Sequence, residues 1–201
     1  MSYKNSSCAF FTIARKFLSL AQVCTDELIK ERNPFCIVSD RLLSSSDIER
    51  ATKWSDRVVS IPILFNFYHG LELTIKGCLC LQLQKTEIKG HKFSELIEKL
   101  NKDLIGENLF SLITKYTINL KETTLLDPNI ILEFLNENEI DIDSWYEALK
   151  YPSGKEGHSF NHIALKYGSK RTLPFWEQLS SDIDKLKVLS GEYFHLHTHQ
   201  P

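Results

Sequence analysis

Four polar residues interrupt an otherwise apolar stretch in the middle of the chain, residues 61–83. At helical spacing Asn66, His69, Glu72 and Lys76 fall within about a third of the circumference and form one polar stripe. Glu72 and Lys76 are spaced i,i+4 in the order that favours an ion pair. The stripe is either a structural ion pair beside a hydrogen-bonded core histidine, because buried charges must be paired, or one wall of a ligand-binding cleft.

Other combinations of reactive side chains are incomplete. Three sets contain residue types that bind metals: His158 with His162, Cys78 with Cys80, and the trio His195, His197 and His199. The first set has no third ligand in register, the second lacks a further pair, and the third aligns only in an extended chain. A phosphate-binding GxxxxGK[ST] loop and a Gly-x-Ser-x-Gly elbow are both absent from the sequence. We therefore expect no metal site and no cofactor.

Composition bounds the class of protein and its partners. A chain of 201 residues with 42% hydrophobic and 25% charged residues is typical of one globular domain. The formal charge of -2 gives no global basic signal, so any contact with nucleic acid must come from a local patch. The odd number of scattered cysteines indicates reduced thiols, and the charges within residues 61–83 argue against a membrane span. We expect a soluble, cytoplasmic protein without a membrane partner.

Helical periodicity positions these side chains along the chain. It predicts helices over residues 9–31, 44–58, 61–83, 91–101, 107–120, 127 onward, 140–150 and 174–189. Ser44 to Asp47 supply N-caps for the second helix, Asp127 caps the sixth, and Pro62 lies either in the first turn of the third or inside a longer helix. The glycine-rich break over residues 151–171 allows a short strand or hairpin arm at 160–167, and the tail 192–201 is expected to fray. The fold class is an all-α, up-and-down helical bundle.

Two motifs in the central region resemble a known family. YHGLELTIKG at residues 68–77 and GHKFSELIEKL at residues 90–100 are similar to the central helix and the "GH-x-L" helix start of HEPN-type domains (higher eukaryotes and prokaryotes nucleotide-binding). These are small all-α bundles found in prokaryotic toxin, antiphage and RNA-cleaving proteins. The resemblance implies a single HEPN-like domain over residues 1–201. Its core helices would occupy about 9–103 and 174–194, and a variable segment about 104–173.

The resemblance also implies a site near the start of a late helix. Active HEPN ribonucleases carry an arginine followed four to six residues later by a histidine. The arginine neutralises the scissile phosphate and the histidine helps to move the proton of the attacking 2′-hydroxyl, so no metal is needed. The matching candidates here are catalytic Lys150, His158 and His162, with Tyr151, Lys155, His69, Glu72 and Lys76 as ligand-binding residues. The chain departs from the motif, because lysine replaces arginine and is a point charge without the two-pronged guanidinium grip. Seven residues separate Lys150 from His158, one more than the family pattern allows. Six residues separate Lys155 from His162, but only Lys150 is followed by the Tyr-Pro pair that follows the arginine in many relatives.

Three functions are compatible with this pattern. The first is a prokaryotic toxin or antiphage-defence protein that cleaves RNA without a metal. The second is a non-catalytic HEPN module that dimerises and binds a nucleotide, nucleic acid or a partner protein, and the missing arginine favours it. The third is a helical scaffold without a ligand.

Partners and the arrangement of the site follow from the resemblance. It implies a homodimer, RNA or a nucleotide as ligand, and a nucleotidyltransferase antitoxin or another defence protein as partner. It also places the central helix beside the late motif, so the stripe at Glu72 and Lys76 and the pair Lys150 and His158 would line one cleft.

Overall fold

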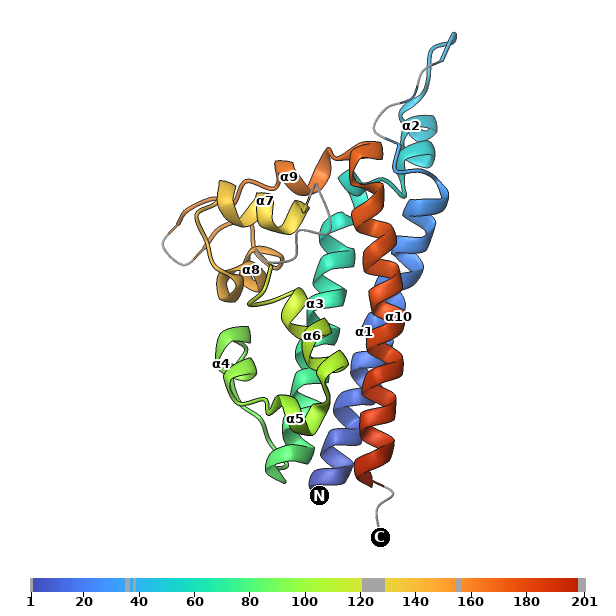
Figure 1. Ribbon diagram of the computed structural model, residues 1–201. Coiled ribbons are helices and arrows are strands. Elements are labelled where there is room, and N and C mark those ends of the chain that lie inside the picture. Colours follow the sequence, from blue (N-terminus) through green and yellow to red (C-terminus); the bar gives the residue numbers. More distant parts are fainter. Residues whose placement is uncertain (1, 35–36, 38, 121–128, 155–156, 199–201) are drawn as a thin grey trace. The chain divides into compact units, whose positions relative to one another are not determined.

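The computed structural model describes residues 2–34, 37, 39–120, 129–154 and 157–198 (Figure 1). Over these residues the chain forms ten α-helices, one 3-10 helix and an isolated antiparallel β-bridge, so the predicted all-α class is confirmed. The helices are α1 (Tyr3–Lys30), α2 (Ser45–Thr52), α3 (Asp56–Leu83), α4 (Phe93–Glu98), α5 (Lys102–Ile105), α6 (Glu107–Lys115), α7 (Ile130–Glu137), α8 (Ile142–Ala148), α9 (Ile163–Lys166), η1 (Ser169–Thr172) and α10 (Leu173–Thr198).

The chain divides into two compact units. Unit 1 comprises residues 1–20, 66–123 and 181–201, and unit 2 comprises residues 21–65 and 124–180. The long helices α1, α3 and α10 each contribute residues to both units. The predicted assignment of residues 9–103 and 174–194 to core helices and of residues 104–173 to a variable segment stays a prediction.

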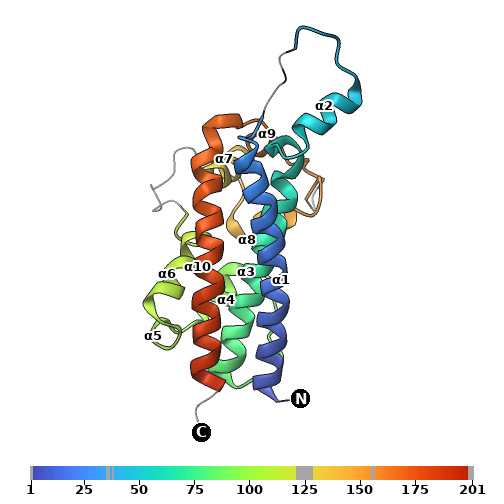
Figure 2. The same ribbon diagram turned by 90° about the vertical axis from the view of Figure 1, so that its right-hand side faces the viewer.

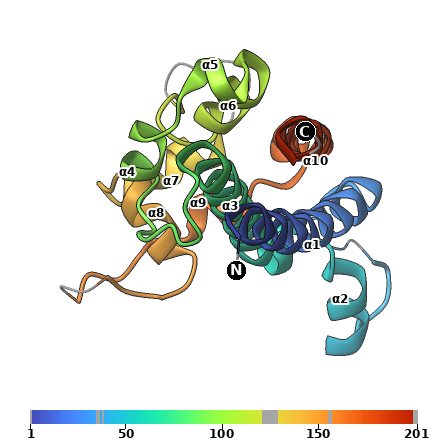
Figure 3. The same ribbon diagram turned by 90° about the horizontal axis from the view of Figure 1, so that it is seen from below.

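Unit 1 is built around the second half of α3. The Tyr68 hydroxyl donates a hydrogen bond to the Tyr116 carbonyl at the end of α6 (2.8 Å), and the Tyr68 ring meets Phe93 of α4 edge to face. On another side, the Ser7 hydroxyl of α1 donates to the Gly77 carbonyl of α3 (2.9 Å). Figure 3, which looks along the helices from the end where α1 begins, shows α3 between α1 and the α4–α6 segment. Residues on all sides of this half of α3 are therefore buried, as its all-round apolar sequence predicts.

The first part of α1 and the last part of α10 also pack together in unit 1 (Figure 2). The rings of Phe11 and Phe194 meet edge to face at 5.6 Å, and Tyr193 is only 4% exposed. The prediction that residues 192–201 fray is wrong as far as Thr198, because these aromatic side chains hold the last turns of α10 on α1. His195 and His197 therefore lie on a helix, while His199 lies outside the described residues.

Replacing glycine by alanine is expected to have opposite effects on stability at two helical positions, Gly70 and Gly191. A Cβ on Gly70 of α3 would lie 2.7 Å from Leu18 Cγ and 3.2 Å from the Ala14 carbonyl oxygen of α1, whereas a Cβ on Gly191 of α10 would meet nothing within 4 Å. Gly70→Ala should lower the free energy of unfolding by about 1 to 3 kcal/mol through overpacking. Gly191→Ala should raise it by about 0.5 to 1 kcal/mol, because alanine loses less backbone entropy in a helix. Urea denaturation of both variants measures the two signs, and equal signs would contradict the close approach of α1 and α3.

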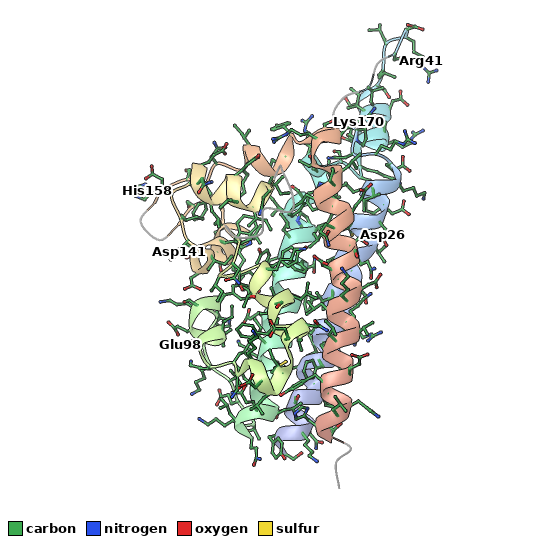
Figure 4. The ribbon with its side chains drawn as sticks, viewed as in Figure 1. Asp26, Arg41, Glu98, Asp141, His158 and Lys170 are labelled. Atoms are coloured by element: carbon green, nitrogen blue, oxygen red, sulfur yellow. The ribbon has the colours of Figure 1, made fainter. Side chains whose placement is uncertain are left out.

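Unit 2 contains short helices with side-chain N-caps. The predicted N-cap within residues 44–47 is confirmed at Ser44, which forms a capping box with Asp47 and opens α2. Asp141, labelled in Figure 4, caps α8 by accepting from the Ser144 N–H (2.8 Å). Asn129 caps α7, whereas the predicted cap Asp127 lies outside the described residues.

Two other local predictions differ from the structure. The predicted strand or hairpin arm at residues 160–167 is wrong in position. The Asn161 side chain accepts from the Ile163 N–H (3.0 Å) and starts the helical turn α9. A short hairpin lies earlier, where Ser153 and Ser159 form the isolated bridge. α2 ends at Thr52, short of the predicted end at residue 58. Of the two positions predicted for Pro62, the structure shows the second, because Pro62 lies inside a longer α3 that begins at Asp56.

By length and composition, α3 alone among the described helices could cross a membrane. Of its most apolar window, 61% is buried within the protein. A largely buried apolar helix is what the core of a soluble protein also contains, so this feature is weak evidence for a membrane span.

Candidate functional site

The predicted polar stripe of α3 holds a buried ion pair in unit 1. Lys76 Nζ lies 2.6 Å from Glu72 Oε1, and the two residues are 6% and 1% exposed. The spacing of one helical turn brings the two side chains together, and His91 of the loop before α4 contacts the same carboxylate. The predicted pairing of Glu72 with Lys76 is confirmed.

Two histidines complete the cluster around the same carboxylate. His91 Nδ1 lies 2.8 Å from Glu72 Oε1, and His69 Nδ1 lies 3.9 Å from Glu72 Oε2. The His69 ring meets Phe17 of α1 edge to face, with centroids 4.4 Å apart. The His91 side chain is 75% exposed, so one face of the cluster around the buried Glu72 carboxylate is accessible to solvent at this imidazole. Glu72 Oε2 is buried without a hydrogen-bond partner among the described residues.

His91 is the member of this cluster that we did not select from the sequence. It stands 19 positions from Glu72, in the second of the two motifs that resemble HEPN domains. The available signal was the Gly-His pair at residues 90–91, where the predicted helix 91–101 starts. The contact between His91 and Glu72 physically joins the two motifs.

The Glu72–His91 pair has a defined chemical capability. A buried carboxylate that accepts from Nδ1 orients the imidazole and leaves Nε2 as the proton-accepting nitrogen. Lys76 supplies the opposite charge next to the buried Glu72 carboxylate, at 2.6 Å. An exposed, oriented imidazole can accept a proton or a hydrogen bond from a ligand at the surface.

The second group of predicted site residues lies in unit 2, around the end of α8. Lys150 Nζ lies 3.5 Å from the centroid of the Tyr146 ring, a cation–π contact. Tyr146 is 4% exposed, and its other ring neighbour is Phe65, stacked at 5.9 Å. Tyr151 follows directly and is 56% exposed. The lysine is therefore held by an anchored aromatic ring, next to an exposed one.

Both ring nitrogens of His162 lie within hydrogen-bonding distance of backbone carbonyl oxygens. Its Nδ1 lies 3.1 Å from the Phe160 carbonyl oxygen, and its Nε2 lies 3.0 Å from the Ala148 carbonyl oxygen. The ring also packs near Phe134, with centroids 5.3 Å apart. Both ring nitrogens thus face carbonyl acceptors of this chain, an arrangement that serves to tie the segment after the hairpin to α8.

His158 is exposed on the loop between α8 and α9, at the edge of unit 2 in Figure 4. Its carbonyl accepts from the Gly154 N–H (2.9 Å), which closes the short hairpin. Lys155 lies outside the described residues. Among the residues that the structure describes, no three His, Cys, Asp or Glu side chains are grouped as metal ligands.

The two groups of site residues belong to different compact units. His69, Glu72, Lys76 and His91 lie in unit 1, while Lys150, Tyr151, His158 and His162 lie in unit 2. A cleft shared by the two groups stays a prediction. Comparison of the chain with protein-family models, with curated proteins and with solved structures gives no match.

Proposed function

We propose that this chain is a HEPN-like module that binds a nucleotide or single-stranded RNA and does not cleave it. The observation that carries the proposal is the position of His162, whose two ring nitrogens both face backbone carbonyl oxygens at 3.0 to 3.1 Å. A general base must reach the proton that it removes, and a ring held in this way is directed at its own chain. The replacement of the family's arginine by Lys150 supports the same conclusion.

The residues at the end of α8 supply what a nucleotide requires. The Lys150 ammonium, held over the Tyr146 ring, offers a positive charge for a phosphate. Tyr151, 56% exposed, offers an aromatic face on which a base can stack. His158, exposed on the following loop, adds a hydrogen-bond donor. A cation next to an exposed aromatic ring is the combination that single-stranded nucleic acids bind.

Fluorescence anisotropy with a labelled single-stranded RNA tests this proposal. Lys150→Ala should weaken binding and reduce the magnitude of the slope of log K against log salt by about 1, the contribution of one phosphate contact. Tyr151→Ala should weaken binding about 5- to 100-fold through the loss of base stacking.

Lys170→Ala is the matched control, because Lys170 is an exposed lysine of the same unit in η1 (Figure 4). It should leave the affinity and the salt slope unchanged. Equal effects of Lys150→Ala and Lys170→Ala, or no RNA binding by the parent protein, would contradict the proposal.

Metal-independent RNA cleavage is the second candidate function, within a toxin or antiphage-defence role. The Glu72–His91 contact of 2.8 Å favours it, because a carboxylate-oriented, exposed imidazole is suited to accept the proton of a 2′-hydroxyl. His158 is the alternative base in unit 2, as the resemblance implies. We also propose, on the resemblance alone, a cytoplasmic homodimer that pairs with a nucleotidyltransferase antitoxin or another defence protein.

A further inference from the structure

A groove between α6 and α10, within unit 1, has no role in the proposed function. It encloses about 600 Å³, a volume typical of small-molecule sites. Its apolar wall includes Leu112, Val188 and Leu189, and Val188 is 57% exposed. Ser111 and Asn108 add hydrogen-bonding groups along α6. A ligand that covers this exposed apolar wall removes apolar surface from water, which favours binding.

The polar end of the groove is built around one buried carboxylate. Asp182 is 2% exposed, and its Oδ2 accepts from Lys115 Nζ and from the Tyr116 hydroxyl (2.9 Å). Lys185 Nζ lies 3.2 Å from Asp182 Oδ1. Two ammonium groups therefore share one carboxylate at this end.

The ionisation of these groups is fixed by their surroundings. Burial alone would raise the pKa of Asp182, but the hydrogen bond and the charge of Lys115, with Tyr116 and Lys185, bring that pKa below its usual value. Burial and the neighbouring Asp182 raise the pKa of Tyr116 well above its usual value, so its hydroxyl remains a donor. Asp184, which also lines the groove, is paired with Lys187 (3.1 Å). Lys187 lies outside the lining of the groove and compensates the charge of Asp184, so Lys115 and Lys185 against the single carboxylate of Asp182 leave one net positive charge at the polar end.

We propose that the α6–α10 groove binds an amphipathic monoanion, a small molecule with an apolar body and one carboxylate. The body covers Leu112, Val188 and Leu189, and the carboxylate takes the excess positive charge at Lys115 and Lys185. A cation of the same shape is repelled, and a neutral analogue loses the charge-assisted hydrogen bonds. The site is independent of the RNA-binding residues, which lie in unit 2.

Isothermal titration calorimetry with three ten-carbon probes tests the site on the full chain. Decanoate, below its micelle concentration, should bind saturably at one site, 1-decanol about tenfold more weakly, and decyltrimethylammonium more weakly still. Val188→Trp should fill the groove and abolish decanoate binding, and Lys185→Gln should weaken it about tenfold.

Val23→Trp is the matched control, because Val23 of α1 is 58% exposed and lies outside the groove. It should leave decanoate binding unchanged. Circular dichroism confirms the fold of each variant, and Lys185→Gln, at a side chain that is 58% exposed, decides the case if Val188→Trp does not fold. Equal affinity for the three probes, tighter binding of the cation, or decanoate binding that survives both Val188→Trp and Lys185→Gln would overturn the proposal.

Discussion

Glu72→Ala is expected to lower the free energy of unfolding by about 3 to 5 kcal/mol. Glu72 is 1% exposed, and its removal leaves the buried Lys76 ammonium without the carboxylate that lies 2.6 Å away. His91 loses the same acceptor, at 2.8 Å, so the link between the two HEPN-like motifs breaks as well. Urea or thermal denaturation followed by circular dichroism measures the loss.

Two controls separate burial from pairing in this prediction. Glu95→Ala removes one partner of an exposed pair, since Lys92 Nζ lies 3.3 Å from Glu95 Oε1, and should cost less than about 1 kcal/mol. The double variant Glu72→Met with Lys76→Met removes both buried charges and should be far less destabilised than Glu72→Ala. A loss below about 1 kcal/mol for Glu72→Ala would contradict the buried cluster.

Asp56→Ala is the second substitution with a large expected effect, a loss of about 3 kcal/mol or more. Asp56 is 1% exposed, and its Oδ2 accepts from the backbone N–H groups of Gly168 (2.8 Å) and Ser169 (3.0 Å). It also accepts from Asn33 Nδ2 (2.9 Å). Alanine leaves the N–H groups of Gly168 and Ser169 without this acceptor, and each such buried group costs about 1 to 3 kcal/mol, whereas Asn33 Nδ2 keeps the Ser169 carbonyl oxygen at 2.7 Å.

Backbone conformation adds to this effect. Asn33 and Ser169 have positive φ angles of 46° and 51°, a backbone conformation that residues other than glycine rarely adopt. The hydrogen bonds to Asp56 hold both residues in place, so Asp56→Asn, which keeps one oxygen acceptor, should cost less than Asp56→Ala. Asp40→Ala, at an exposed aspartate, should change stability by less than about 0.5 kcal/mol. Urea denaturation compares the three variants, and equal stabilities for Asp56→Ala and Asp40→Ala would exclude this role.

Features with a local cause could be predicted from the sequence. The end of α3, the start of α6 and both ends of α8 were predicted within two residues, because apolar periodicity acts within a few residues. The observed α3 begins five residues earlier than predicted, and α6 ends five residues earlier. The Glu72–Lys76 pair was predictable for the same reason, since one helical turn fixes the distance between the two side chains.

Features with a long-range cause could not be predicted. The contact of His91 with Glu72 depends on how the loop before α4 returns to α3, and the helical tail depends on Phe194 meeting Phe11. His162 was selected for its spacing from a lysine, but its role is set by the carbonyl oxygens of Phe160 and Ala148. Tertiary contacts of this kind override local signals such as the glycine-rich break that allowed a strand at residues 160–167.

The integrity of RNA incubated with the protein tests the central claim most directly. A labelled single-stranded RNA is held with the full chain at a concentration that saturates binding, with and without a chelator, and is then resolved on a denaturing gel. If the protein binds RNA without cleaving it, the RNA stays intact in both lanes, while fluorescence anisotropy of the same sample shows that the complex has formed. Fragments that persist in the chelator and disappear with His91→Ala or His158→Ala would contradict the account, and the variant that removes them would identify the base.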